Sequence, residues 1–204
     1  MNSFFNLSTN LILIKDLSDE IDFDLIRSEF DKLEFTKNLH NEISINRDLF
    51  NRPEFKEIKE ALEKECEDYL RNAYNVNLFE KIEITNSWAN RSTQGGSHQD
   101  HAHPFSVVSG VLYLDDNPDN LNFAMNTSSQ EIPCYLYKKQ IQATIRDLAG
   151  SEDNLKNHLL LILSNVGHQV FPAQLDTARR TIAFNTFWKG CTGNADDILN
   201  SRVF

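Results

Sequence analysis

The chain has no long apolar run and little cysteine, and each shortage excludes a class of protein. No hydrophobic stretch in the 204 residues approaches the ~20 residues that span a bilayer. The first residues also lack the basic and apolar regions of a secretory signal. The three cysteines, Cys66, Cys134 and Cys191, lie far apart and indicate reduced thiols rather than a disulfide framework. These absences predict a cytoplasmic protein with no membrane partner.

Positive charge is also scarce. Lys and Arg number 20 against 30 Asp and Glu, which gives a formal net charge of −10. A general nucleic-acid-binding protein would carry a basic face, so this balance disfavours that class. Hydrophobic residues make up 40% of the chain and charged residues 25%, as in globular proteins, which excludes wholesale disorder. A chain of this length can bury its own core and fits one domain.

Helical periodicity is confined to the first part of the chain. Apolar residues recur at helical spacing over 21–33 and again over 55–73, after a short apolar run at 10–15 that is typical of a buried strand. From residue 79 onward the period shortens to two. Strands are expected at 82–88, 107–114, 121–125, 132–137, 159–163 and 179–187.

Helices followed by many short strands are typical of an α+β chain whose β part is a sandwich or barrel. A jelly roll fits best, because its interior offers a pocket with ligands from strand ends. We expect a single domain over residues 1–204, with a helical flank at 1–78, a mainly β jelly-roll core at 79–190 and a surface tail at 191–204. The polar segment 140–157 is expected to be a loop with a short helix, or a lid over the pocket.

Four metal-ligand side chains lie within six residues: His98, Asp100, His101 and His103. Neutral imidazole and carboxylate groups together suit divalent iron, zinc or manganese. Residues two apart on a strand share a face, so either His98-x-Asp100 or His101-x-His103 can supply a pair of ligands. The sequence therefore predicts a metal site at the mouth of the strand that follows.

A third ligand and an anion-binding residue follow at a distance. A mononuclear iron site needs three protein ligands on one side of the metal, which leaves positions for a cosubstrate and oxygen. His168 follows the strand expected at 159–163 and a short turn, and Arg179-x-Thr181 begins the last strand. When 2-oxoglutarate chelates a metal, its far carboxylate needs a fixed cation, which an arginine with a neighbouring hydroxyl supplies.

At this point the residues resemble a known family. His101-Ala102-His103-Pro104 leads into Ser109-Gly110-Val111-Leu112-Tyr113, with Trp88-Ala89-Asn90 before it and Arg179-x-Thr181 after it. This pattern is similar to that of 2-oxoglutarate and Fe(II)-dependent oxygenases of bacteria and phages. The resemblance covers about residues 88–188. It implies a double-stranded β-helix fold, with Fe(II) as the metal and 2-oxoglutarate as cosubstrate.

The resemblance also favours one of the two ligand pairs over the other. It preserves the His-x-His step before the Ser-Gly-x-x-Tyr strand, so it favours His101, His103 and His168 as the catalytic metal ligands. The pair His98 and Asp100 stays open as the alternative, because many oxygenases of this kind use His-x-Asp.

The remaining pocket residues follow from alternation along the strands. Arg179 and Thr181 are expected to bind 2-oxoglutarate, and Arg180 is a rival anchor because a shift of one residue would exchange the two arginines. Tyr113 and Asn90 are expected to face the same pocket by the period-two rule. The mostly apolar face of this strand, with Arg180, Ile182 and Phe184, is expected to pack away from the pocket.

Together these expectations predict an oxygenase. The reaction predicted is hydroxylation, with dioxygen, of a small molecule or an amino-acid side chain. Two alternatives remain. Gly95 followed by His101-x-His103 also opens a cupin metal motif, although residues 104–114 lack the glutamate that cupins add. A non-catalytic jelly-roll protein that binds a metal or ligand at its histidine-rich mouth is the other.

Overall fold

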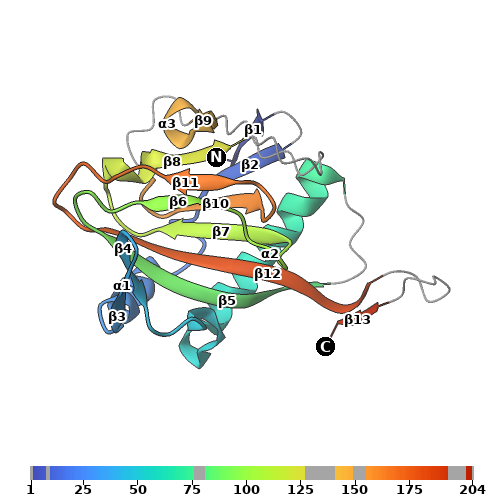
Figure 1. Ribbon diagram of the computed structural model, residues 1–204. Coiled ribbons are helices and arrows are strands. Elements are labelled where there is room, and N and C mark those ends of the chain that lie inside the picture. Colours follow the sequence, from blue (N-terminus) through green and yellow to red (C-terminus); the bar gives the residue numbers. More distant parts are fainter. Residues whose placement is uncertain are drawn as a thin grey trace.

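Two antiparallel sheets form the body of the protein, and two helices cover the larger one (Figure 1). The computed structural model describes residues 2–7, 10–75, 81–126, 141–148, 155–192 and 201–203. In spatial order the large sheet contains β1 (Asn2–Leu7), β2 (Asn10–Asp16), β10 (His158–Leu163), β7 (Val108–Tyr113), β12 (Arg179–Thr192), β5 (Lys81–Ser92), β4 (Asn41–Ser44) and β3 (Phe35–Asn38). The short β13 (Ser201–Val203) pairs with the end of β12.

The small sheet carries most of the histidines singled out above. Its order is β6 (His98–His101), β11 (His168–Val170), β8 (Phe123–Asn126) and β9 (Ile141–Thr144). Adjacent strands in both sheets run antiparallel, as in a jelly roll. The predicted fold class, mainly β with a jelly-roll core, is therefore confirmed.

The helices begin and end where local chemistry directs. Helix α1 (Phe23–Phe30) is capped by Asp22, whose carboxylate accepts the Leu25 N–H at 2.9 Å. Helix α2 (Lys56–Tyr74) follows a 3₁₀ turn opened by Pro53, and it ends at Asn75 in the left-handed conformation (φ 52°). A third helix, α3 (Ile145–Leu148), is a single turn, and further 3₁₀ turns lie at Leu49–Asn51 and Pro118–Asn122. Within the described residues, no helix has both the length and the apolar character needed to cross a bilayer.

Two hydrophobic cores hold the layers together. One lies between the helices and the large sheet, where Leu62 of α2 and Phe184 of β12 are fully buried. The other lies between the two sheets and includes Tyr113, Phe123 and Leu160. The large sheet is thus covered on both faces, and the space between the sheets is the place for a pocket.

Most of the predicted strands are confirmed, and one expectation about the ends of the chain is wrong in part. Residues 1–78 are more than a helical flank, because β2 and β4 pair with central strands of the large sheet. The tail at 191–204 contains β13, which pairs with β12. The strand expected at 132–137 lies outside the described residues, whereas the short helix expected within 140–157 is α3.

Gly110 on β7 lies directly opposite Phe184 on β12. A Cβ added at Gly110 would stand 2.2 Å from Cζ of the Phe184 ring, far inside contact distance. The ring cannot retreat easily, because it is fully buried and packs edge-on against Phe50 at 5.9 Å between centroids. The glycine of the Ser-Gly-x-x-Tyr segment is therefore a packing requirement of the large sheet.

We expect Gly110→Ala to lower the free energy of unfolding by ~1–3 kcal/mol, the usual cost of overpacking a core. Chemical denaturation of the two proteins measures this difference. In a Phe184→Leu background the same substitution should cost much less, because the ring that it strikes is gone. Equal losses in both backgrounds would contradict the proposed clash.

Candidate metal and cosubstrate site

Three histidines converge between the two sheets. His101 ends β6 and His168 begins β11, and the two are direct partners across that ladder. His103 follows β6 and is positioned by its backbone N–H, which donates to the Ser164 carbonyl at 2.8 Å. One ring nitrogen from each histidine lies within 4.8 Å of the others, and Nε2 of His103 is 3.3 Å from Nε2 of His168. This spacing could hold one metal ion.

The hydrogen bonds of two of these rings direct lone pairs toward that point. Nδ1 of His101 lies 2.7 Å from the Gln99 carbonyl, and Nδ1 of His168 lies 2.9 Å from the Val166 carbonyl. Because a carbonyl oxygen only accepts, each Nδ1 carries a proton, and in the neutral ring Nε2 then keeps its lone pair. Such a bond from the far nitrogen is the usual support of a metal-binding histidine.

Burial favours the neutral form of His168 and His103. Desolvation, followed by the neighbouring His101, lowers the pKa of His168 to about 3 and that of His103 to about 4. Neutral imidazole is the form that binds a metal, so the residues present fit a divalent transition metal.

Nδ1 of His103 lies 3.4 Å from Nδ2 of Asn185, whose Oδ1 accepts from the Ser109 hydroxyl. An amide can present its oxygen as well as its nitrogen, and the oxygen would accept from Nδ1 and free Nε2 of His103 for a metal. Asn185 is held by the Ser109 hydroxyl at 2.8 Å, and Ser109 in turn contacts Ser164 at 2.7 Å. Sequence reasoning missed this support, although Ser109 opens the Ser-Gly-x-x-Tyr segment and Asn185 lies within β12.

The alternative pair does not join this cluster. Nε2 of His98 lies 2.9 Å from Nδ2 of Asn41, and since an amide N–H only donates, that lone pair of His98 is engaged. Burial first, and then Arg179, lower the pKa of His98 to about 4. Among the described residues, the three histidines form the only convergent group of metal-ligand side chains, and it does not include Asp100.

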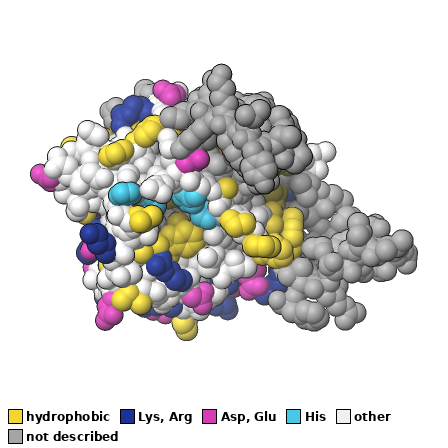
Figure 2. Space-filling view, in the orientation of Figure 1, with side chains coloured by type: hydrophobic (Ala, Val, Ile, Leu, Met, Phe, Trp, Pro, Cys, Tyr) yellow, Lys and Arg dark blue, Asp and Glu magenta, His cyan; other side chains and the backbone are white. Residues whose placement is uncertain are grey.

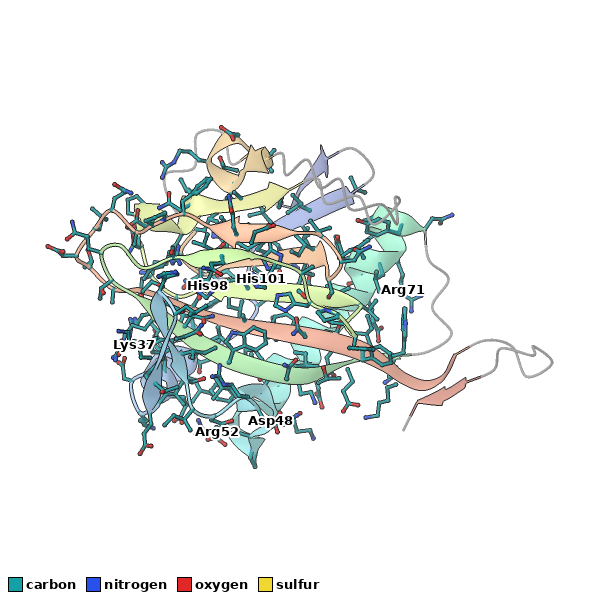
Figure 3. The ribbon with its side chains drawn as sticks, in the orientation of Figure 1. Lys37, Asp48, Arg52, Arg71, His98 and His101 are labelled. Atoms are coloured by element: carbon teal, nitrogen blue, oxygen red, sulfur yellow. The ribbon has the colours of Figure 1, made fainter. Side chains whose placement is uncertain are left out.

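Figure 3 shows His98 and His101 on β6, beside the strands of the large sheet. Histidine side chains reach the molecular surface on this side, next to hydrophobic atoms (Figure 2). A cavity of about 410 Å³ opens here and is lined by all three clustered histidines and by His98.

Arg179 lies at the inner wall of this cavity, with 5% of its surface exposed. Its Nη1 donates to the Asp119 carbonyl at 3.1 Å, and no carboxylate of the described residues lies within 4.0 Å of its guanidinium. The Asp119 carboxylate instead accepts the N–H groups of Gln174 and Leu175 at 2.8 and 3.0 Å. Burial lowers the pKa of Arg179. A buried cation without a counter-ion is a strong anion-binding group.

Arg180 points to the other side of β12. It pairs with Asp115 and Asp31, each at 2.7 Å. Arg179 lines the cavity, whereas Arg180 does not.

The other predicted pocket residues form a row across three strands. Thr181 on β12 is paired in register with Asn90 on β5 and with Tyr113 on β7. All three line the cavity with Arg179. Burial raises the pKa of Tyr113, so its hydroxyl keeps its proton and can donate a hydrogen bond.

Comparisons with known proteins agree with this arrangement. The family model described as "Putative 2OG-Fe(II) oxygenase" matches residues 86–185. No curated protein matches the chain significantly in sequence.

Solved structures share the fold at low sequence identity. HygX from Streptomyces hygroscopicus, crystallised with nickel, 2-oxoglutarate and hygromycin B, is 13% identical over 88% of this chain and 84% of its own, with a TM-score of 0.62. A Pseudomonas putida prolyl-4-hydroxylase is 15% identical over 90% and 96%, with a TM-score of 0.54. The epimerase SnoN from nogalamycin biosynthesis is 8% identical over 95% and 86%, with a TM-score of 0.63. The family match spans the three histidines and the row of cavity residues from Asn90 to Thr181, and over this stretch the chain belongs to the 2OG-Fe(II) oxygenase family.

Proposed function

We propose that the protein is an Fe(II)- and 2-oxoglutarate-dependent dioxygenase that hydroxylates an organic substrate. One observation carries this proposal: three convergent imidazoles line the same cavity as a buried arginine that forms no ion pair with a carboxylate of the described residues. The family match supports the cofactor class. HygX, which has a similar fold, was crystallised with 2-oxoglutarate and a metal.

In this proposal His101, His103 and His168 hold the iron through Nε2. Iron bound there would supply the redox chemistry that activates dioxygen, which no amino-acid side chain can provide. The backbone carbonyls of Gln99 and Val166 keep the protons of His101 and His168 on Nδ1. Asn185 would do the same for His103 with its amide turned, so that the oxygen rather than the nitrogen faces Nδ1. The protein thus directs two lone pairs before the metal arrives, which reduces the ordering that binding must impose.

Arg179 binds the far carboxylate of 2-oxoglutarate. Its guanidinium offers paired N–H groups, and its burial strengthens their interaction with a carboxylate. The hydroxyls of Thr181 and Tyr113 and the amide of Asn90 lie across the neighbouring strands and complete the hydrogen bonding. The apolar side chains Leu160, Ile162 and Val170, which also line the cavity, exclude water around the carbon chain of the cosubstrate.

The proposal is tested first by binding and then by turnover. Anaerobic addition of Fe(II) and 2-oxoglutarate should give a weak visible charge-transfer band. Air should then convert 2-oxoglutarate to succinate slowly, even without a substrate. If the intact protein took up no metal and gave no band, the oxygenase proposal would be refuted.

The same measurements separate the alternatives. A cupin enzyme would bind iron without depending on 2-oxoglutarate, and a non-catalytic binding protein would hold zinc tightly and form no succinate. Once a substrate is found, mass spectrometry distinguishes a hydroxylase from an epimerase, because only the hydroxylated product gains an oxygen atom.

A further inference from the structure

We infer that the substrate is a small organic anion, and that Arg47 at the open side of the cavity binds its carboxylate or phosphate group. The inference rests on the proposed function, in which 2-oxoglutarate occupies the Arg179 end of the same cavity. It concerns the other end, where Arg47 is the second cation of the lining.

The charges of the cavity lining are one-sided. Among the described residues that line it, two are arginines and none is an aspartate or glutamate. This is unexpected for a chain whose formal net charge is −10. The clustered histidines add no negative charge, unlike a site with a carboxylate ligand. A cleft lined by one sign of charge attracts ligands of the opposite sign, so a cationic substrate would find no partner here and an anionic one would.

The two arginines occupy different ends of the cavity. Arg179 is paired in register with Ser92 of β5, whereas the carbonyl of Arg47 accepts the N–H of Ser87 at 2.9 Å. Ser87 and Ser92 are five residues apart, which corresponds to roughly 16 Å along a strand. Arg47 therefore lies beyond the reach of a carboxylate bound at Arg179, near the level of Trp88 and His103.

Arg47 combines a fixed backbone with an available side chain. Ser87 anchors its segment twice, through the bond to the Arg47 carbonyl and through its hydroxyl, which accepts the Phe50 N–H at 2.8 Å. The guanidinium is exposed and makes no ion pair or hydrogen bond with the described residues. The neighbouring Asp48 is engaged with Asn51 instead. An arginine in this position can bind an incoming anion without first breaking an internal bond.

The surrounding residues indicate what the rest of the substrate resembles. Trp88, next to Ser87 on β5, lies with its ring 5.9 Å from that of His103. An apolar or planar body packed on Trp88 would lie between Arg47 and the histidines. The cavity volume of about 410 Å³ is near the lower end of the ~300–1,000 Å³ found for small-molecule sites. These features together fit a small molecule with one anionic end.

The test uses matched probes and the full-length protein, loaded with Mn(II) and saturated with 2-oxoglutarate. The probes are phenylacetate, benzylphosphonate, the neutral phenylacetamide and the cationic phenethylamine. Binding is followed by tryptophan fluorescence, since Trp88 lines the cavity. We expect at least one of the two anions to bind about tenfold more tightly than the amide, and the amine to bind most weakly. The phosphonate and the carboxylate compared with each other distinguish the two anion types.

Two variants assign the preference to Arg47. Arg47→Gln should remove the tenfold difference, and Arg47→Glu should favour the amine. The matched control is Lys37→Gln, which removes an exposed cation on β3 whose side chain does not line the cavity (Figure 3). It should keep the preference of the wild-type protein.

Binding of 2-oxoglutarate is measured first in the same sample, which separates the two hypotheses. Its absence would refute the proposed function and with it this inference. If 2-oxoglutarate binds, equal affinity for the anions and the amide overturns this inference alone, as does an anion preference that survives in Arg47→Gln.

Discussion

Replacing Arg179 with glutamine should weaken 2-oxoglutarate binding by a factor of 30 or more. Truncating one partner of a buried charge pair costs ~2–5 kcal/mol, and each ~1.4 kcal/mol is a factor of ten in affinity. Arg179 is almost completely buried and its guanidinium has no carboxylate partner among the described residues, so a bound carboxylate would be its counter-ion. Calorimetric titration of 2-oxoglutarate into Mn(II)-loaded protein measures the loss.

The substitution should leave folding nearly intact. A buried cation without a counter-ion costs desolvation free energy, and its removal offsets the lost hydrogen bond to the Asp119 carbonyl. The matched control is Arg180→Gln, which breaks the ion pairs with Asp115 and Asp31 on the other face of the same strand. Because these pairs are partly exposed, the control should lose only ~0.2–1 kcal/mol of stability and keep its affinity for 2-oxoglutarate. The opposite pattern, with binding lost only in Arg180→Gln, would contradict the assignment.

The contrast between these two arginines shows what strand periodicity can predict. Along residues 179–185 polar and apolar residues mostly alternate, and the face that holds Ile182 and Phe184 is the more apolar one. Once one face is buried against the helices, the other must face the opposite sheet. The direction of Arg179 and Thr181 therefore follows from the sequence, as do the strands β5, β7 and β10.

Strands β3 and β4 could not be predicted in the same way. Their sequences, Phe35–Asn38 and Asn41–Ser44, are short and mainly polar. They are strands because β4 pairs with β5. That pairing joins Glu42 to Arg91, residues 49 positions apart, which is far beyond any local pattern.

This omission had a consequence at the site. Asn41, on the unpredicted β4, contacts Nε2 of His98. Without that contact, His98-x-Asp100 and His101-x-His103 are equally good ligand pairs by spacing. The support of His103 by Asn185 was hidden for a similar reason, since the two residues are 82 positions apart.

The choice of metal ligands carries the other large prediction. Replacing His103 with alanine should lower the affinity for Co(II) or Fe(II) by more than 100-fold. Loss of a residue that merely supports a ligand typically costs 10–100-fold, so loss of the ligand itself should exceed this. His103 is only partly buried, and its removal is expected to leave the fold intact. The absorption spectrum of the Co(II) protein reports both the affinity and the number of nitrogen ligands.

His168→Ala should abolish metal binding as well, but it tests more than the ligand. His168 is 5% exposed, stacks on Phe123 with ring centroids 5.1 Å apart and donates to the Val166 carbonyl. Its truncation leaves a cavity and an unpaired carbonyl, so the protein should also lose stability, by ~2–4 kcal/mol. The stability of His168→Ala is therefore measured by a thermal melt without metal, alongside the metal titration. His103→Ala, which is expected to fold normally, reports the effect on metal affinity alone.

Asp100→Asn and His98→Gln are the matched variants for the alternative pair. Asp100 does not join the convergent group, and the Nε2 lone pair of His98 is engaged by Asn41. Both variants should keep Co(II) affinity within a few-fold of the wild-type protein. If the metal were held by His98, Asp100 and His168, the result would reverse: Asp100→Asn would lose the metal and His103→Ala would retain it. Spacing alone could not decide between the two neighbouring ligand pairs. Asp100→Asn and His103→Ala, three residues apart, decide between them.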